Sequence, residues 1–111
     1  MNFDEYQKAA ERTMRLKTLP RNELVLHSLV GMCSEAGEVA GIYQKSLQGH
    51  PIDLEHLKKE VGDVLWMIAE FCTAHGWSMD EVAEINIEKL RARYPEGFSA
   101  EKSQHRREGD V

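Results

Sequence analysis

Apolar residues recur along this chain at every third or fourth position, the spacing that places them on one side of an α-helix. We find no stretch in which apolar and polar residues alternate as they do in a half-buried strand. The helical pattern breaks where proline, glycine and polar residues gather. We therefore predict an all-α subunit with four helices, over residues 3–17, 22–47, 53–75 and 78–93.

Residues typical of helix ends stand at these breaks. The candidate caps, whose side-chain oxygens can accept hydrogen bonds from free N–H groups in the first turn, are Asn2, Asn22, Asp53 and Ser78. Gly76 follows the third helix, as a left-handed glycine often does. The short Q-G-H-P stretch after the second helix indicates a reversal of the chain. We expect the second and third helices to form an antiparallel hairpin at the centre of a bundle-like subunit.

Two pairs of acids lie on this hairpin. S-E-A-G-E-V-A-G carries Glu35 and Glu38, and K-E-V-G-D-V-L-W-M carries Glu60 and Asp63. Each pair has i, i+3 spacing, which places both carboxylates on one helix face. Because the pairs are symmetric about Gly49 in the turn, the first acid of one pair lies opposite the second acid of the other. We therefore expect all four carboxylates to face one another at one level.

Acids in such apolar surroundings need compensation. Burying an unpaired carboxylate is costly, and neighbouring negative charges repel one another. Either the group is strongly protonated, or lysine and arginine side chains neutralise it, or it binds a divalent cation. A ligand set made only of oxygen atoms suits Mg²⁺, with Mn²⁺ as a substitute.

A solvated helix face and a di-iron bundle are the alternatives to a magnesium site. An isolated E-x-x-E is most often a solvated face, but two pairs symmetric about a turn and embedded in apolar sequence are not typical of one. A di-iron bundle normally uses two Glu-x-x-His pairs. Neither pair in this chain ends in histidine.

Candidate ligand-binding residues lie on the third and fourth helices. Asn86, Lys89 and Arg93 follow one another at i, i+3 and i+7, a donor-rich ridge suited to phosphate oxygens. The alternative for Lys89 and Arg93 is that they are surface cations near a helix C-terminus. Trp66, close to the second acidic pair, could stack on a base, and the alternative is a core tryptophan.

Length and charge narrow the class of protein. The 111 residues suffice for one domain, which we assign to residues 1–96, followed by a polar tail over 97–111. A net charge of −5 makes a nucleic-acid polymer an unexpected partner. No apolar run approaches the length of about 20 residues that spans a bilayer. We expect a cytoplasmic protein that does not enter membranes, with Cys33 and Cys72 as reduced core thiols.

The helix over residues 22–47 is apolar on two faces. A subunit of this size has too few other helices to cover both faces. We therefore predict a homodimer or homotetramer, in which a neighbouring subunit completes or closes the functional site.

Three sequence blocks, E-A-G-E, E-V-G-D-V-L-W and N-I-E-K-L-R-A-R-Y-P-E-G-F-S, follow in this order. Together they resemble the MazG-type nucleoside triphosphate pyrophosphohydrolases of the all-α NTP pyrophosphatase superfamily, whose signature is E-x-x-E followed by E-x-x-D. The resemblance covers residues 3–106. It implies a helical homo-oligomer whose carboxylates hold magnesium. It also implies that the substrate, an NTP or dNTP, is cleaved between its α and β phosphates to the monophosphate and pyrophosphate.

The resemblance also implies roles for individual residues. The metal ligands and catalytic acids would be Glu35, Glu38, Glu60 and Asp63. Asn86 and Lys89 match the N-x-x-K of the family and would serve the metal shell and the phosphates, and Arg93 matches the arginine of R-Y-P. One carboxylate could act as general base toward the attacking water.

Two alternative functions stay open at this stage. The phosphoribosyl-ATP pyrophosphohydrolases share the acidic motifs but lack an N-x-x-K-L-x-x-R-Y-P ending. A non-catalytic nucleotide-binding helical module would not need four acids at matched height. Such a module should show no change in stability or nucleotide binding when magnesium is added.

Overall fold

The computed structural model describes residues 1–15 and 18–111, and the regular elements in these ranges are all helical. In chain order they are α1 (Phe3–Ala10), the 3₁₀ turn η1 (Glu11–Thr13), α2 (Arg21–Leu47), α3 (Leu54–His75), α4 (Met79–Arg93) and α5 (Ala100–Gln104). The all-α prediction is confirmed. The predicted count of four helices is wrong, because the short α5 forms within the segment 97–111, where Ser99 caps its first turn.

The first helix is shorter than predicted. α1 ends at Ala10 and the chain continues as a 3₁₀ turn. The hydroxyl of Thr13 donates to the carbonyl oxygen of Ala10 at 2.7 Å, a local bond that competes with helix continuation. Met14 then has extended backbone angles. The predicted end of this helix, Lys17, lies outside the described residues.

Three of the four predicted caps are confirmed. Asn2 forms a capping box with Glu5, and the side chains of Asp53 and Ser78 accept hydrogen bonds from N–H groups in the first turns of α3 and α4. The prediction for Asn22 is wrong. The chain enters α2 through Pro20, whose carbonyl oxygen accepts the first hydrogen bonds of the helix, so α2 starts one residue before Asn22. At the end of α3, Gly76 has φ +73°, as a helix-ending glycine should.

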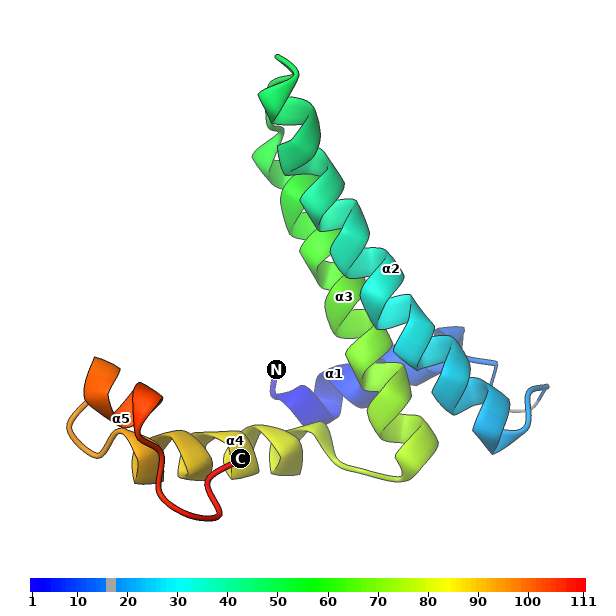
Figure 1. Cartoon of the computed structure of the whole chain (residues 1–111). Coiled ribbons are helices and arrows are strands. Elements are labelled where there is room, and N and C mark those ends of the chain that lie inside the picture. Colours follow the sequence, from blue (N-terminus) through cyan, green and yellow to red (C-terminus); the bar gives the residue numbers. More distant parts are fainter. Residues whose placement is uncertain (16–17) are drawn as a thin grey trace.

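The long antiparallel hairpin of α2 and α3 dominates the molecule (Figure 1). α1 crosses the base of this hairpin, and α4 runs away from the base to one side. The core lies where α1, α3 and the start of α4 meet. Its buried residues are Ala69, Cys72 and Met79, with Ala10, Met14, Leu65 and Ile68 packed against them.

Hydrogen bonds join the start of α1 to the start of α4. One carboxylate oxygen of Asp4 accepts from the Ser78 hydroxyl at 2.7 Å and from the Asp80 N–H at 3.1 Å. In return, an Asp80 oxygen accepts from the Phe3 N–H at 3.1 Å. These bonds fix the direction in which α4 leaves the hairpin.

A polar contact joins α2 and α3 near the base of the hairpin. The Nδ1 atom of His27 lies 2.6 Å from an oxygen of Glu70, whose side chain is almost completely buried. Arg21 adds a hydrogen bond from its Nε to the carbonyl oxygen of Ala74 at 2.8 Å. These contacts close the lower part of the hairpin, so the two helices hold a fixed register.

Much apolar surface stays uncovered in the single chain. On α2, Leu26 and Val30 are more than half exposed. The prediction for Cys33 as a core thiol is wrong because it is exposed on α2, whereas Cys72 is buried as predicted. The two apolar faces of α2 therefore differ: one packs on α3 and the other is open. None of the described helices has the length and hydropathy needed to cross a membrane.

Candidate functional site

Three carboxylates meet between α2 and α3. One oxygen each of Glu35, Glu60 and Asp63 lies within 4.8 Å of the others, and all three residues are half-buried. Within residues 1–15 and 18–111, this is the one group of acids, histidines or cysteines close enough to share a metal ion. The predicted symmetry about Gly49 therefore places acids of both helices at one level. We call these three residues the acidic cluster.

The acidic cluster holds unfavourable negative charge. Burial raises the pKa of Glu35, and the charges of nearby acids raise it further; in decreasing order these are Asp63, Glu60 and Glu38. A raised pKa means that the protein disfavours the ionised form of this side chain. A cation among these oxygens would relieve both the repulsion and the loss of hydration. The donor set consists only of hard oxygen atoms, and it therefore fits Mg²⁺ or Mn²⁺.

Glu38 departs from the predicted arrangement. Its side chain is exposed, and it is not among the oxygens that lie within 4.8 Å of one another. The helical spacing is not the cause, because Glu60 and Asp63 have the same i, i+3 spacing and both belong to the acidic cluster. Glu38 is still near enough for its charge to raise the pKa of Glu35. The expectation of four carboxylates facing one another thus holds for three.

Two residues that we did not predict lie next to the acidic cluster. His56 places Nε2 at 3.0 Å from an oxygen of Glu60, four residues further along α3. Tyr6 on α1 is near Asp63. Burial is the main cause that raises the pKa of the tyrosine, and the charge of Asp63 raises it further. The i, i+4 spacing of His56 and Glu60 is a sequence signal for their contact. No comparable signal exists for Tyr6, because its contact joins helices far apart in the sequence.

An open groove is lined in part by Tyr6, which lies near Asp63 of the acidic cluster. It has a volume of about 620 Å³, within the usual range for small-molecule sites. Gly62, the neighbour of Asp63, forms part of its wall. The lining residues are Met1, Asn2, Phe3, Tyr6, Gly62, Leu65 and Asp80.

The side chain of Trp66 contacts the 3₁₀ turn η1. Its indole N–H donates to the hydroxyl of Thr13 at 2.8 Å, and the residue is half-buried. The tryptophan is therefore held against the 3₁₀ turn. Met67, the next residue, fills the space beside Gly31, because a Cβ atom added to the glycine would clash with the methionine sulfur.

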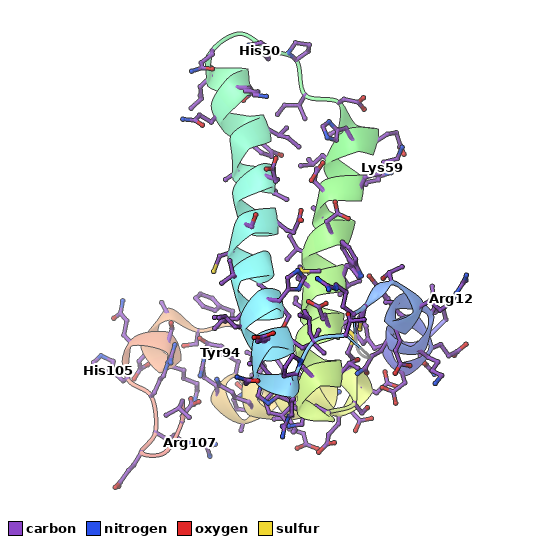
Figure 2. All side chains as sticks on the ribbon, turned by 90° about the vertical axis from the view of Figure 1, so that its right-hand side faces the viewer. Arg12, His50, Lys59, Tyr94, His105 and Arg107 are labelled. Carbon is purple, nitrogen blue, oxygen red and sulfur yellow. The ribbon has the colours of Figure 1, made fainter. Side chains whose placement is uncertain are left out.

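The donor residues of α4 are not brought to the acidic cluster by the single chain. α4 runs away from the hairpin (Figure 1), and Asn86 and Lys89 are exposed. No hydrogen bond or ion pair that the described residues form links Asn86, Lys89 or Arg93 to the four acids. Arg93 instead pairs with Asp110 of the C-terminal segment, a contact that sequence analysis did not predict. Figure 1 shows this segment beside the outer part of α4, away from the hairpin, and Figure 2 shows His105 and Arg107 at the opposite end of the molecule from His50 at the hairpin tip.

Comparisons with known proteins connect this arrangement to a family. A family model described as "MazG nucleotide pyrophosphohydrolase domain" matches residues 25–98, more than half of the chain. The matched stretch contains the acidic cluster, Glu38 and the donor residues of α4. The curated proteins and the solved structures gave no match.

Proposed function

Because the chain belongs to the MazG nucleotide pyrophosphohydrolase family, we propose that it hydrolyses an NTP or dNTP between the α and β phosphates, in a metal-dependent reaction that gives the monophosphate and pyrophosphate. The observation that carries this proposal is the meeting of Glu35, Glu60 and Asp63 within 4.8 Å at the centre of the hairpin. Half-buried acids so close together are unfavourable without a cation.

The acidic cluster would hold Mg²⁺, or Mn²⁺ in its place, and Glu38 would join it by a change of side-chain rotamer. A divalent cation there supplies Lewis-acid chemistry, which offsets charge on phosphate oxygens and lowers the pKa of water. A carboxylate of the cluster that keeps a free oxygen accepts the proton of the attacking water.

The remaining groups bind and orient the substrate. Asn86, Lys89 and Arg93 donate to phosphate oxygens, since their amide, ammonium and guanidinium groups all carry N–H donors. The 620 Å³ groove beside Asp63 gives the nucleoside space next to the acids. Trp66 is the candidate for stacking on the base, because its ring is partly exposed and the bond to Thr13 fixes its orientation.

We further propose that the site is shared between subunits of a homodimer or homotetramer. α4 carries its donors away from the acids of its own hairpin. This arrangement supports a role for these donors in binding substrate phosphates at the acidic cluster of a neighbouring subunit. The uncovered apolar face of α2 supports the same assembly, because association would remove it from water. A two-fold axis is the simplest arrangement, since isologous dimers are the commonest soluble homo-oligomers.

A panel of ribo- and deoxyribonucleoside triphosphates, with separate detection of pyrophosphate and orthophosphate, tests the activity. We expect pyrophosphate as the first product, no turnover in excess chelator and recovery on addition of Mg²⁺ or Mn²⁺. Glu60→Gln should lose this activity, and Glu88→Gln, an exposed α4 change outside the acidic cluster, is its matched control and should keep it. Orthophosphate as the first product, or full activity in chelator, would overturn the proposal.

A further inference from the structure

The C-terminal segment places a carboxylate on Arg93. Asp110 accepts two hydrogen bonds from the guanidinium, one from Nε and one from a terminal nitrogen, each at 2.8 Å. The two side chains are only 9% and 7% exposed, although both belong to the outer part of the molecule. A bidentate, planar pair of this kind is also how arginine binds phosphate oxygens.

Further cations surround the same carboxylate. The hydrogen bonds from Arg93 hold the pKa of Asp110 below its usual range, against the effect of burial, and the charges of Arg106 and Lys89 lower it further. A groove of about 320 Å³ opens here, lined by Lys89, Ala92, Arg107, Glu108, Gly109, Asp110 and Val111. The surroundings of Asp110 therefore attract anions.

A turn at Gly109 places the carboxylate of Asp110 beside Arg93. Gly109 has φ +85°, and the N–H of Asp110 donates to the carbonyl oxygen of Arg107 at 3.1 Å. The α4 residue and its partner are 17 positions apart, so the carboxylate is tethered by a short connection. A group on a short tether acts at an effective concentration in the millimolar range.

We propose that Arg93 and Lys89 form a polyphosphate-binding site, and that Asp110 is an internal competitor that occupies it until a phosphate chain displaces the C-terminal segment. The identification of the ligand as the phosphate chain of a nucleotide rests on the proposed function. The competition itself rests on the contacts of Arg93 and Asp110. While the C-terminal segment is in place, the Arg93 guanidinium binds the Asp110 carboxylate. Once the segment is displaced, the same N–H groups bind phosphate oxygens.

Calorimetric titration with inorganic triphosphate, in metal-free buffer, tests the competition without requiring catalysis. Asp110→Asn removes the negative charge and the bidentate acceptor. Because a tethered competitor is then lost, triphosphate should bind the variant at least about threefold more tightly than the unaltered chain. Glu101→Gln, on α5, removes one negative charge from the same segment without touching Arg93 and is the matched control. Arg93→Ala should abolish the gain, so that Asp110→Asn has no further effect in its presence.

Hydrogen exchange on the unaltered chain gives a second measurement that does not depend on the folding of any variant. Saturating triphosphate should speed exchange of the Asp110 N–H, because release of the segment breaks its bond to Arg107. Unchanged exchange, or equal effects of Asp110→Asn and Glu101→Gln on triphosphate affinity, would overturn the proposal.

The two proposals fail in different ways. If Asp110→Asn tightens triphosphate binding but no nucleoside triphosphate yields pyrophosphate, the polyphosphate site stands and the proposed reaction falls. If hydrolysis occurs, Asp110→Asn should lower KM by the same factor as the triphosphate Kd and leave kcat unchanged. Hydrolysis with an unaltered KM in this variant would overturn the competition alone.

Discussion

Glu35 illustrates how the surroundings of one side chain connect stability to ligand binding. Its pKa is raised, so the folded chain binds a proton at this position more tightly than the unfolded chain does. The stability that this preference contributes is fully present at pH values below the ordinary glutamate pKa. It is lost as the pH rises through the raised pKa of Glu35. A divalent cation and a proton therefore compete for the same carboxylate.

The first prediction concerns Glu35→Gln in the absence of metal. Because the amide cannot ionise, the variant should be as stable as the unaltered chain or more stable at neutral pH, and this advantage should shrink as the pH falls. Thermal unfolding in chelator across this pH range measures the difference. Glu88→Gln should show no such pH dependence. Lower stability of Glu35→Gln at neutral pH would show that the negative charge has a favourable partner.

The second prediction concerns Glu38, which lies outside the acidic cluster in the single chain. If Glu38 joins the metal site, Glu38→Ala should reduce kcat/KM by more than about 100-fold, as the loss of a transition-state charge stabiliser does. The double variant with Glu35→Ala should lose little more, since residues that act as a unit are not additive. Steady-state kinetics is the measurement. Near-normal turnover of Glu38→Ala would leave three carboxylates as the ligand set.

At the scale of the helices, local patterns were the reliable predictors. Asp53, Ser78 and Gly76 act through bonds or backbone angles within a few residues, and the structure confirms all three. The hairpin brings Glu35 and Asp63 together because the turn lies midway between them. Helical spacing and a short reversal thus sufficed to predict the three residues of the acidic cluster.

Two features were not predicted from the sequence. One depends on competition between two possible helix starts, and the other on a contact between residues far apart in the chain. Pro20 replaced Asn22 at the start of α2 because the carbonyl oxygen of the proline accepts the first hydrogen bonds. The pairing of Arg93 with Asp110 joins α4 to a polar segment without helical periodicity over most of its length. The spacing of residues along one chain does not report such contacts.

The third prediction tests the end of α3. Gly76→Ala should lower the free energy of unfolding by about 1 kcal/mol, because a left-handed backbone costs an L-residue roughly 1–2 kcal/mol and the stiffer unfolded chain offsets part of this. Urea unfolding measures the change. Gly76→Asn should recover some of the loss, since asparagine tolerates this conformation better. Equal stability of the alanine variant would mean that the turn after α3 relaxes without cost.

The whole molecule leaves apolar surface on α2 and α4 open to water. Leu26, Leu29 and Val30 lie on α2, and Ile85 and Ile87 on α4, and each is at least 45% exposed. Exposed apolar area on this scale is typical of a surface that another protein covers. Of these two helices, α2 also carries Glu35 and Glu38, and α4 carries the candidate phosphate donors.

The fourth prediction is therefore an oligomer that depends on this surface. Sedimentation at micromolar concentration should show a dimer or tetramer, and Leu29→Glu should dissociate it, because a charge would be buried at the interface. Activity should fall with dissociation if neighbouring subunits share the site. Leu29→Met, a change of similar volume, is the control and should keep the assembly. A stable monomer with full activity would contradict the shared site.

The bonds between Asp4 and the first turn of α4 also bear on how the chain acquires its structure. They join residues that are 74 to 77 positions apart, whereas α2 and α3 are neighbours in sequence. Contacts between distant parts of a chain form more slowly than local ones, because a long loop must first close. During synthesis, we expect the hairpin to form, and α1 to pack on α3, before α1 has its hydrogen-bond partners on α4. The bonds of Asp4 and Phe3 can form only after Ser78 and Asp80 have emerged, which makes the fixing of α4 against the amino-terminal helix a late step in folding.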